Sequence, residues 1–417
     1  IVIDEEHERT YKQEDAPRYH ARDVAIMRAK MEHAVVILGT ATPSLESYFN
    51  AQKGKYNILH LSKRVENRAL PKVRIIDMRK EVDRHARFTH FSHLLETQIK
   101  NCLSRKEQAI IFLNRRGFSP VVMCPKCGKS ISCEHCDMAL TYHRTQNLLM
   151  CHLCGITKKM LTQCPNCQHA NFKQLGVGTQ RIESLLRKIL PQIKIERMDT
   201  DSTTHKDAHY NILKMFRDGH TQVLVGTQMI AKGLDFPNVT LVGVISADIA
   251  MSLPDFRMGE YIFQLLTQVA GRSGRGEKGG EVFVQTFTPM HPVIRAAAAH
   301  DYLSFYEAEI QYRRELNYPP FYCFVVVLFE GRSQSSVKDQ AQDFARALAQ
   351  KAVGNLVRVV GPHPAPLERI KENYRWQIIA SAKTRLALHG LIRLAWNEVE
   401  KKSSVKITVD VDPMSMT

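Results

Sequence analysis

The stretch Ile1-Val2-Ile3-Asp4-Glu5-Glu6-His7 decides how this 417-residue chain is interpreted. A short apolar run that passes at once into carboxylates predicts a buried strand with acidic groups at its end. Such groups can hold Mg²⁺ on a nucleotide, with Asp4 coordinating the ion and Glu5 acting as general base. Acidic runs at strand ends are usually just solvated, so this interpretation depends on the rest of the chain.

Two further segments repeat the pattern of an apolar run followed by a polar loop. Val-Val-Ile-Leu at 35–38 leads into Gly-Thr-Ala-Thr-Pro-Ser at 39–44. Small hydroxyl residues there suit a relay between a nucleotide site and a moving neighbour, although they equally form an ordinary turn. Val-Leu-Val-Gly-Thr-Gln at 223–228 is a second such segment, and Ala-Lys-Gly-Leu-Asp-Phe follows it at 231–236.

The segment Gln268-Val-Ala-Gly-Arg-Ser-Gly-Arg275 carries two arginines three residues apart. Arg272 and Arg275 can lie on one helical face or reach around one turn. Their planar guanidinium groups suit the charge that develops on a triphosphate during hydrolysis. The alternative is a basic loop that binds nothing in particular.

Eight of the ten cysteines form four Cys-x-x-Cys pairs between positions 124 and 167. The pairs are Cys124 with Cys127, Cys133 with Cys136, Cys151 with Cys154, and Cys164 with Cys167. Two intervening residues let a tight turn present both sulfurs to one ion, so the array predicts two structural four-sulfur Zn²⁺ sites. A disulfide framework and a thioredoxin-like dithiol are the alternatives, but this long chain does not need disulfides and a redox motif would occur once. The spacing leaves nested, consecutive and interleaved pairing open.

The charge balance favours a polyanionic partner. The chain has 58 basic and 42 acidic residues, a net charge of +16, which suits nucleic acid but also occurs in ribosomal and membrane-surface proteins. No apolar run approaches the roughly 20 residues that span a bilayer, and no signal peptide is visible. Thiolates used as metal ligands indicate a cytoplasmic protein. Because the chain begins inside an apolar run without an initiator Met, we expect a fragment or a processed product.

The last hundred residues predict a two-layer α/β sandwich of the split βαβ type. The expected order is strand 322–329, helix 335–352, strand 356–361, strand 374–382, helix 384–401 and strand 404–411. A basic loop around 362–376 either faces DNA or is simply solvated. Earlier in the chain, apolar residues between Ile182 and Leu190 recur at helical spacing, and Thr179 is the expected N-cap of that helix.

Together these segments resemble superfamily 2 helicases. Five motifs occur in the order of that superfamily, at residues 4–7 (motif II), 40–42 (motif III), 110–117 (motif IV), 225–236 (motif V) and 268–275 (motif VI). Within it the chain resembles the primosomal protein N′ family of bacterial replication-restart helicases. Three features carry this closer resemblance: an aromatic-rich segment at 11–22, the cysteine array directly after motif IV, and the signatures at 361–366, 374–377 and 410–413.

The resemblance implies an α/β architecture of two tandem RecA-like lobes, the first one incomplete. Residues 1–62 would form the rear half of lobe 1, and 72–122 with 169–288 would form lobe 2. The zinc-binding insertion would span 123–168, a helical bridge 289–320, and a C-terminal α+β domain 321–417.

The resemblance also implies an activity, namely ATP-dependent 3′ to 5′ translocation on DNA during replication restart and primosome assembly. Asp4 would hold Mg²⁺, Glu5 would activate water, and Gln268, Arg272 and Arg275 would sense the γ-phosphate. Gly233 and Asp235 would help to bind ATP. DNA contacts would come from the following residues: Tyr11, Lys12, Arg18, Tyr19, Arg22, Arg115 and Thr227.

Cofactors and partners follow from the same resemblance. The zinc pairing would be nested, so that the outer pairs at 124–127 and 164–167 share one ion and the inner pairs at 133–136 and 151–154 share the other. Partners would be single-stranded and forked DNA, primosome proteins and single-stranded-DNA-binding protein, with no membrane. The expected form is a monomer in the bacterial cytoplasm, at the nucleoid.

One motif of an ATPase is missing from this chain, the phosphate-binding loop G-x-x-x-x-G-K-[ST]. The resemblance places that loop upstream of Ile1, together with a DNA-binding region. We therefore expect the 417 residues alone to bind ATP poorly or not at all. Two alternatives remain, a different superfamily 2 translocase and a non-catalytic zinc-containing platform that docks DNA or proteins.

Overall fold

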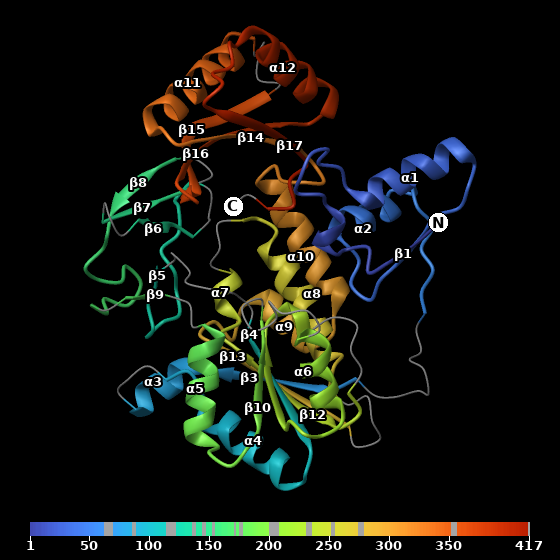
Figure 1. Cartoon of the computed structure of the whole chain (residues 1–417), viewed down its shortest axis with the longest axis vertical. Helices are drawn as coiled ribbons and strands as arrows, with labels where there is room; N and C mark the ends of the chain where they lie inside the picture. The colour runs from blue at the N-terminus through green and yellow to red at the C-terminus, as the bar shows by residue number, and fades with distance from the viewer. Residues whose placement is uncertain are drawn as a thin grey trace.

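The computed structural model describes most of the chain. The described residues are 1–61, 70–85, 89–113, 122–135, 139–143, 147–151, 155–170, 172–174, 178–199, 208–230, 236–251, 255–273, 279–351 and 357–415. A parallel sheet with its helices lies at the bottom of Figure 1 and the C-terminal domain (residues 321–415) at the top. The amino-terminal segment (residues 1–61) and the cysteine module (residues 122–174) lie on opposite sides between them.

The central sheet has six strands, and every neighbouring pair is parallel. In spatial order they are β10 (Ile195–Met198), β11 (Val223–Gly226), β4 (Gln108–Leu113), β12 (Val239–Ile245), β13 (Glu281–Thr286) and β3 (Lys72–Asp77). Strands β4, β11 and β12 are buried along their whole length. Continuous burial is expected of a parallel sheet that is covered on both faces.

Helices cover this sheet on both faces, and alternate residues of one strand show it. Ile110 and Phe112 of β4 belong to one hydrophobic core, whereas Ala109, Ile111 and Leu113 belong to the other. The first core includes residues of α6 (Ala208–Arg217) and α8 (Met258–Ala270), and the second those of α4 (His93–Ser104) and α5 (Thr179–Ile189). The period of two between the faces is that of a regular strand. Shorter elements of this part are α3 (Met78–His85), α7 (Asp248–Met251) and the 3₁₀ turn η3 (Gln228–Ile230).

Helix α5 is amphipathic as predicted, with Ile182 and Leu186 buried. The prediction that Thr179 is its N-cap is wrong, because Gly178 occupies that position and Thr179 is the first helical residue. The Thr179 hydroxyl donates instead to the carboxylate of Asp199, which lies just past strand β10. Helix and strand are thereby tied together by a buried side-chain bond.

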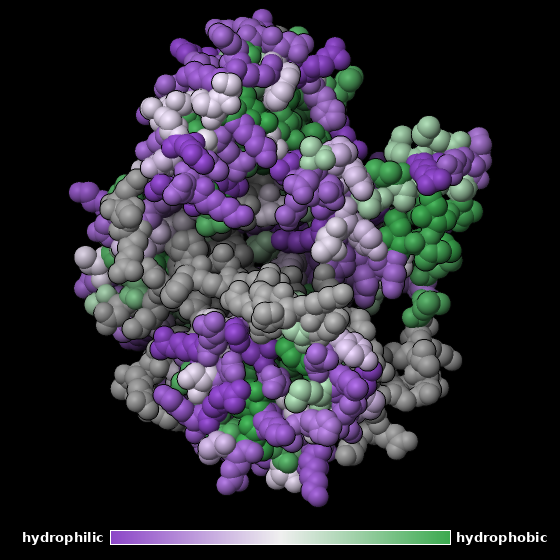
Figure 2. Space-filling model, viewed as in Figure 1, coloured by the Kyte–Doolittle hydropathy of each residue, from purple (hydrophilic) through white to green (hydrophobic). Residues whose placement is uncertain are grey.

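The amino-terminal segment contains two parallel strands, β1 (Val2–Asp4) and β2 (Ile37–Gly39). They are accompanied by the 3₁₀ turn η1 (Arg9–Tyr11) and by helices α1 (Ala21–Glu32) and α2 (Leu45–Gln52). Many apolar side chains of α1 and the strands are exposed, and they form the green area at the right of Figure 2. Helix α2 differs, since its Leu45 and Tyr48 are buried in the core formed with α8 and α10.

A helical bridge joins the sheet to the C-terminal domain. It consists of α9 (Pro292–Ala298) and α10 (Tyr302–Glu315), whose N-caps are His291 and Asp301. Tyr302 and Tyr306 of α10 meet Tyr48 of α2 edge to face, with ring centroids 5.2 Å and 4.5 Å apart. The bridge therefore holds the amino-terminal segment as well as the C-terminal domain.

The C-terminal domain has the predicted order of elements, β-α-β-β-α-β. Its elements are β14 (Cys323–Gly331), α11 (Gln334–Lys351), β15 (Val357–Ile370), β16 (Asn373–Ala382), α12 (Arg385–Glu398) and β17 (Lys406–Val411). The sheet order is β15-β16-β14-β17 with all neighbours antiparallel, which is a split βαβ arrangement. Strand β15 is longer than predicted, because after two register shifts it continues as a hairpin with β16.

The cysteine module leaves and rejoins the sheet domain through one short ribbon. Strands β5 (Val122–Met123) and β9 (Lys173–Gln174) pair antiparallel at its base, a few residues beyond the predicted end at 168. Between them, β6 (Thr141–His143), β7 (Leu148–Met150) and β8 (Thr157–Lys159) form an antiparallel sheet. The module is thus an insertion in the sheet domain whose two ends lie side by side.

Among the described residues, the helices are too short or too polar to cross a membrane.

Candidate nucleotide site and candidate metal centre

The carboxylates of the opening motif lie at the end of strand β1, where the carboxyl ends of the two parallel strands meet. Asp4 is exposed, and its Oδ1 accepts a hydrogen bond of 3.0 Å from the backbone N–H of Glu5. Glu5 has a left-handed backbone with φ of 48°, which turns the chain sharply after the strand. Carboxylate oxygens at such an edge are the ligands that Mg²⁺ prefers, so the exposed Asp4 and the partly exposed Glu5 fit the predicted ion.

Glu6 has a structural role at the candidate site that the sequence did not reveal. It is 1% exposed, and its carboxylate accepts bonds from the Ser44 backbone N–H (2.6 Å) and the Ser44 hydroxyl (3.0 Å). The Ser47 hydroxyl (2.9 Å) and the Arg22 guanidinium (2.9 Å) also donate to it. Ser44 is the N-cap of α2, so Glu6 fixes the start of that helix to the end of β1.

His7 connects three segments that are far apart in the sequence. Its Nδ1 lies 2.7 Å from the hydroxyl of Thr40, and its Nε2 lies 2.9 Å from the side-chain nitrogen of Gln268. An amide nitrogen can only donate, so Nε2 accepts and Nδ1 carries the proton that is donated to Thr40. His7 is 6% exposed. The residues matching motifs II, III and VI therefore meet at one imidazole ring.

The remaining predicted ATP-site residues are only partly covered by the structure. Arg272 follows the C-terminal end of α8, and its backbone N–H donates to the carbonyl of Val269. Gly233, Asp235 and Arg275 lie outside the described residues. Gln268 thus lies on α8 and contacts His7 just past the end of β1, and Arg272 lies just after the same helix.

The aromatic-rich loop folds back onto the strand end and onto the C-terminal domain. The Tyr11 hydroxyl donates to the carbonyl of Asp4 at 2.7 Å. Lys12 Nζ lies 2.8 Å from a carboxylate oxygen of Asp410 in β17, and Arg18 lies 3.8 Å from the same carboxylate. Tyr19 is 47% exposed, so stacking of this ring on a base stays a prediction.

Several predicted DNA contacts have other partners here. Arg22 pairs with Glu6 and Lys12 with Asp410, and both cations are largely buried, which gives them structural roles in place of the expected display to DNA. Thr227 is 2% exposed, so its side chain offers no surface either. Arg115 lies outside the described residues.

Burial also shifts the pKa of a histidine in this loop. Removal from water, followed by the nearby positive charge of Arg22, lowers the pKa of His20 to about 4. The carboxylates of Asp23 and Glu46 oppose the shift without cancelling it. His20 is therefore neutral at physiological pH in the folded protein.

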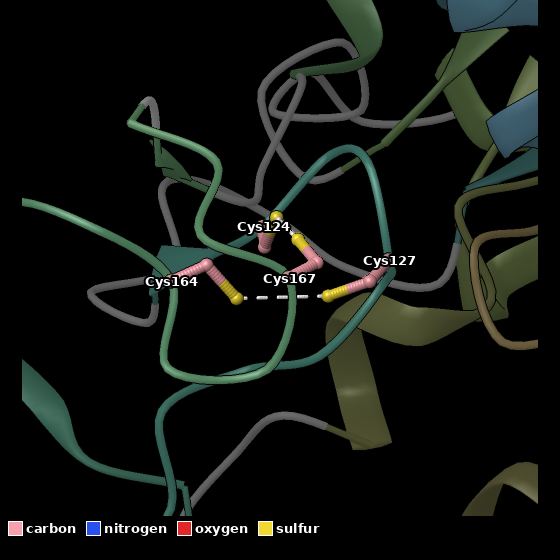
Figure 3. A group of neighbouring side chains, drawn as sticks. All are labelled: Cys124, Cys127, Cys164 and Cys167. Atoms are coloured by element: carbon pink, nitrogen blue, oxygen red, sulfur yellow. Dashed lines mark hydrogen bonds between the residues drawn. The ribbon is translucent and has the colours of Figure 1, made fainter.

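The outer four cysteines converge on one point, as Figure 3 shows. All four sulfurs lie within 4.8 Å of one another, with Cys124 and Cys167 at 3.5 Å and Cys127 and Cys164 at 3.7 Å. These separations exceed a disulfide bond of about 2.05 Å. A tetrahedral Zn²⁺ with Zn–S bonds of about 2.3 Å places its sulfurs about 3.8 Å apart, so the residues fit a zinc ion.

Three of the Cys-x-x-Cys turns share one backbone geometry. In each, the backbone N–H of the first cysteine donates to the carbonyl of the residue five positions later. The backbone N–H of the residue four positions later donates to the carbonyl of that cysteine. The partners are Lys129 and Gly128 for Cys124, Ile156 and Gly155 for Cys151, and His169 and Gln168 for Cys164. The fourth residue after the cysteine has positive φ in all three, at Gly128, Gly155 and Gln168. In the turns at Cys124 and Cys164 this backbone geometry accompanies two sulfurs that lie close to the same point, as a metal site requires.

The inner set is seen only in part. Cys133 and Cys151 are buried, whereas Cys136 and Cys154 lie outside the described residues. The nested pairing is therefore supported for the outer four, which the structure brings together, and stays a prediction for the inner four.

Each end of the module rests on a different neighbour. A Cβ at Gly128 would lie 2.2 Å from the carbonyl oxygen of Phe287, so the outer turn packs directly on the chain just past β13. A Cβ at Gly155 would lie 3.9 Å from the ring of His363 in β15. Burial lowers the pKa of His363.

Comparison with known proteins gives two family models and a set of relatives. A Helicase conserved C-terminal domain matches residues 145–277, and a Primosomal protein N C-terminal domain matches residues 314–414. The chain is 45% identical to Replication restart protein PriA of Bacillus subtilis over all of its length, which is 52% of that protein. The proteins of the same name from Chlamydia trachomatis (41% identical, 55% of its length) and Haemophilus influenzae (38%, 57%) also match the whole chain.

The chain thus spans about half the length of the curated relatives that it matches. Among solved structures, S. cerevisiae Dbp5 bound to RNA and ADP BeF3 is 13% identical, covering 76% of this chain and 62% of its own. Its TM-score of 0.35 is too low to carry an argument.

Proposed function

Because the chain belongs to the PriA family of replication restart proteins, we propose that it forms part of an ATP-dependent DNA helicase that moves 3′ to 5′ at stalled replication forks. In this proposal residues 1–61 and the six-stranded sheet domain supply the two sides of one ATP site. The phosphate-binding loop that the site needs would come from the part of the longer protein that this chain does not contain.

One observation carries the proposal, the contact between His7 and Gln268. These residues are 261 positions apart and lie in the two segments that resemble motifs II and VI. Their hydrogen bond brings the carboxylates at the end of β1, Asp4 and Glu5, near the C-terminal end of α8. A nucleotide between two such surfaces would meet carboxylates on one side and arginine on the other, which is the charge arrangement that phosphoryl transfer uses.

The proposed roles follow the chemistry of each side chain. Asp4 would hold Mg²⁺, which supplies charge neutralisation when bound, and Glu5 would orient the attacking water. Gln268 and Arg272 would respond to the γ-phosphate, together with Arg275. Thr40 would transmit the state of His7 to the loop before α2, because its hydroxyl accepts the hydrogen bond from Nδ1–H.

DNA and protein partners are also proposed. The net charge of +16 favours a polyanion, and the exposed Tyr19 next to Arg18 offers a ring on which an unpaired base could stack. Single-stranded and forked DNA, primosome proteins and single-stranded-DNA-binding protein are the partners that the family suggests. Two structural Zn²⁺ ions in the cysteine module would keep it rigid enough to engage a strand or a partner.

The ATP proposal is tested in the full-length protein with Arg272→Ala. DNA-stimulated ATP turnover should fall about 100-fold or more, because a positioned donor to developing charge is lost. Affinity for single-stranded DNA, measured by fluorescence anisotropy, should stay within about twofold. Arg314→Met, an exposed arginine of α10, is the matched control. Undiminished turnover in Arg272→Ala would reject the assigned role.

The isolated 417-residue chain provides the second arm. Since it contains no G-x-x-x-x-G-K-[ST] segment, it should hydrolyse ATP poorly or not at all. If it still binds forked DNA, the alternative function as a non-catalytic docking platform applies to this piece. Strong ATP turnover by the piece alone would show that the nucleotide site is built differently.

The metal proposal is tested by elemental analysis of the purified protein. Two zinc ions per chain are expected, and Cys164→Ser should lose one of them while Cys102→Ser, a buried cysteine outside the array, should lose none. A zinc content that Cys164→Ser does not change would exclude the site formed by the outer four cysteines.

A further inference from the structure

Four buried charged side chains and one partly buried one lie together where the amino-terminal segment, α8 and α10 meet. We call them the charged cluster: Glu46 of α2, Arg257 and Glu260 at the start of α8, and Glu309 and Arg313 of α10. The side chain of Arg313 is fully buried, and those of Arg257 and Glu260 are 6% and 7% exposed. Charges that are this deeply buried persist only when each is paired.

The pairing is direct and links all three elements. Arg313 donates to Glu260 at 2.7 Å and to Glu309 at 3.3 Å. Arg257 donates to Glu46 at 2.6 Å, which joins α8 to α2. Burial alone would raise the pKa of Glu46, but Arg257 and Arg313 outweigh it and hold that pKa well below the usual range. Glu46 is therefore ionised and bound in the folded state.

Glu260 makes one contact that the other members do not. Its Oε1 accepts the backbone N–H of Leu45, the first residue of α2, at 2.9 Å, while its Oε2 binds Arg313. The first amides of a helix lack partners inside the helix, and a carboxylate there is favoured by the helix dipole. Arg313 thus orients the carboxylate of Glu260, which binds the first backbone N–H of α2 in the amino-terminal segment.

Helix α8 contacts the amino-terminal segment at both of its ends. Glu260 binds Leu45 at one end, and Gln268 binds His7 at the other. Eight residues of α-helix separate these contacts by about 12 Å. Within the amino-terminal segment, the two contacted residues are linked through their neighbours. Glu6, next to His7, accepts a hydrogen bond from the backbone N–H of Ser44, next to Leu45. Helix and segment therefore form one closed ring of contacts.

We propose that Glu260 and Arg313 are positioning residues of the ATP site, which act by fixing α8 so that Gln268 meets His7. Neither residue touches the predicted nucleotide position. Because α8 is rigid and is held at both ends, these contacts allow it only one position along the segment. Loss of the Glu260 contact therefore shifts Gln268, although the two residues are more than two helical turns apart. This inference rests on the proposed ATP site.

The structural part is tested without reference to ATP turnover. Hydrogen exchange in the full-length protein is compared among wild type, Glu260→Gln, Glu260→Ala and Arg313→Met. Glu260→Gln keeps an acceptor for Leu45 and loses only the charge, so it guards against a variant that simply fails to fold. Exchange of the first α2 amides should accelerate about tenfold in Glu260→Ala and less in Glu260→Gln. Glu307→Gln, exposed on the same helix α10, should leave it unchanged.

The functional part is a double-mutant cycle on ATP turnover. Glu260→Ala alone should lower kcat about tenfold or more, with KM for ATP within about twofold, because positioning is lost and not binding. In a Gln268→Ala background the same substitution should have little further effect, since the residue through which it acts is gone. Additive effects, or unchanged exchange at α2, would overturn the proposal. Absence of ATP turnover in the wild type would instead refute the proposed function and leave the exchange result standing.

Discussion

The C-terminal domain encloses a core of its own, whereas the amino-terminal segment shares the core of its neighbours. Val327, Phe329 and Phe344 are buried between the antiparallel sheet and helices α11 and α12. In the amino-terminal segment, the two strands leave Val2 and Ile37 exposed, and it is α2 that is buried, through Leu45 and Tyr48 against α8 and α10. The fold of the C-terminal domain thus depends mainly on contacts within itself, and that of the amino-terminal segment on contacts across to the bridge and the sheet domain.

The difference explains why the charged cluster lies on one side only. A region with its own core needs little help to keep its position, whereas α2 must be aligned against helices that belong to other parts of the chain. Directed bonds such as Leu45 N–H to Glu260 supply that alignment, which apolar contacts alone do not. The comparison predicts that the two regions can be loosened independently.

The largest effect is expected from Phe344→Ala in the C-terminal domain. The ring is fully buried and packs edge to face on Phe329, so its loss should destabilise the domain by about 3–5 kcal/mol. Hydrogen exchange should accelerate in β14 and β16 and stay unchanged in α2. Leu386→Ala, whose side chain is 86% exposed, is the control. Equal acceleration in α2 would show that the two regions unfold as one unit.

The converse change is Leu45→Ala. Its side chain is fully buried at the start of α2, so about 3 kcal/mol of stabilisation should be lost, mainly from the amino-terminal segment. Limited proteolysis should then cut within residues 1–61 while the C-terminal domain remains intact. Leu59→Ala, at a position that is 91% exposed, should behave like the wild type. Protection of the segment in Leu45→Ala would contradict a dependence on the shared core.

A smaller effect is expected where the two regions touch each other. Asp410→Asn removes the charge that Lys12 and Arg18 approach, and it should cost about 2 kcal/mol because Lys12 is nearly buried. Exchange should accelerate in the loop 11–20 more than in either core. Asp339→Asn, an exposed carboxylate of α11, is the control. An unchanged loop would mean that the hydrogen bond from Tyr11 to the carbonyl of Asp4 holds it without help.

The smallest effect is a pH dependence of the amino-terminal segment. Burial and then Arg22 lower the pKa of His20 to about 4, with Lys12 acting in the same sense and Asp23 and Glu46 in the opposite sense. The unfolded chain then binds more protons, so stability is complete above about pH 6.5 and falls as the pH drops toward 4.

The measurement is the unfolding free energy of the segment, from hydrogen exchange, between pH 7 and pH 4. His20→Asn should flatten the decline over this window, whereas His209→Asn, at an exposed position, should not. A decline that is equally steep without His20 would assign the pH dependence to other groups, such as His90, whose pKa burial also lowers to about 4.

The same contrast separates what the sequence could predict from what it could not. The order of elements in the C-terminal domain follows from local patterns, because each strand and helix there packs on its neighbours in the chain. The backbone N–H of Leu45 is bound by Glu260, and Glu6 binds the backbone N–H of Ser44. No local sequence pattern encodes either of these partners. Thr179 was assigned to the N-cap by residue type alone, yet its hydroxyl is used by Asp199.

The candidate site divides in the same way. The resemblance to motifs II and VI implied that Gln268 reaches the γ-phosphate, which stays a prediction, and the structure places Gln268 against His7. The predicted DNA contacts at Lys12 and Arg22 were not found as displayed cations, because a charge near a carboxylate inside the protein looks the same in sequence as a charge on its surface. Four outer cysteines converge as the nested pairing requires, although spacing alone allowed other arrangements.

The turn at Gly128 has a mechanical consequence. Its Cα hydrogen faces the carbonyl of Phe287 with no room for a methyl group. Phe287 is itself held by the carboxylate of Asp248, which accepts a hydrogen bond of 2.9 Å from the Phe287 backbone N–H. Because the two backbones already touch, the Phe287 carbonyl cannot move toward Gly128 without pushing the turn. A tilt of the sheet domain would therefore move the cysteine module at this contact as well.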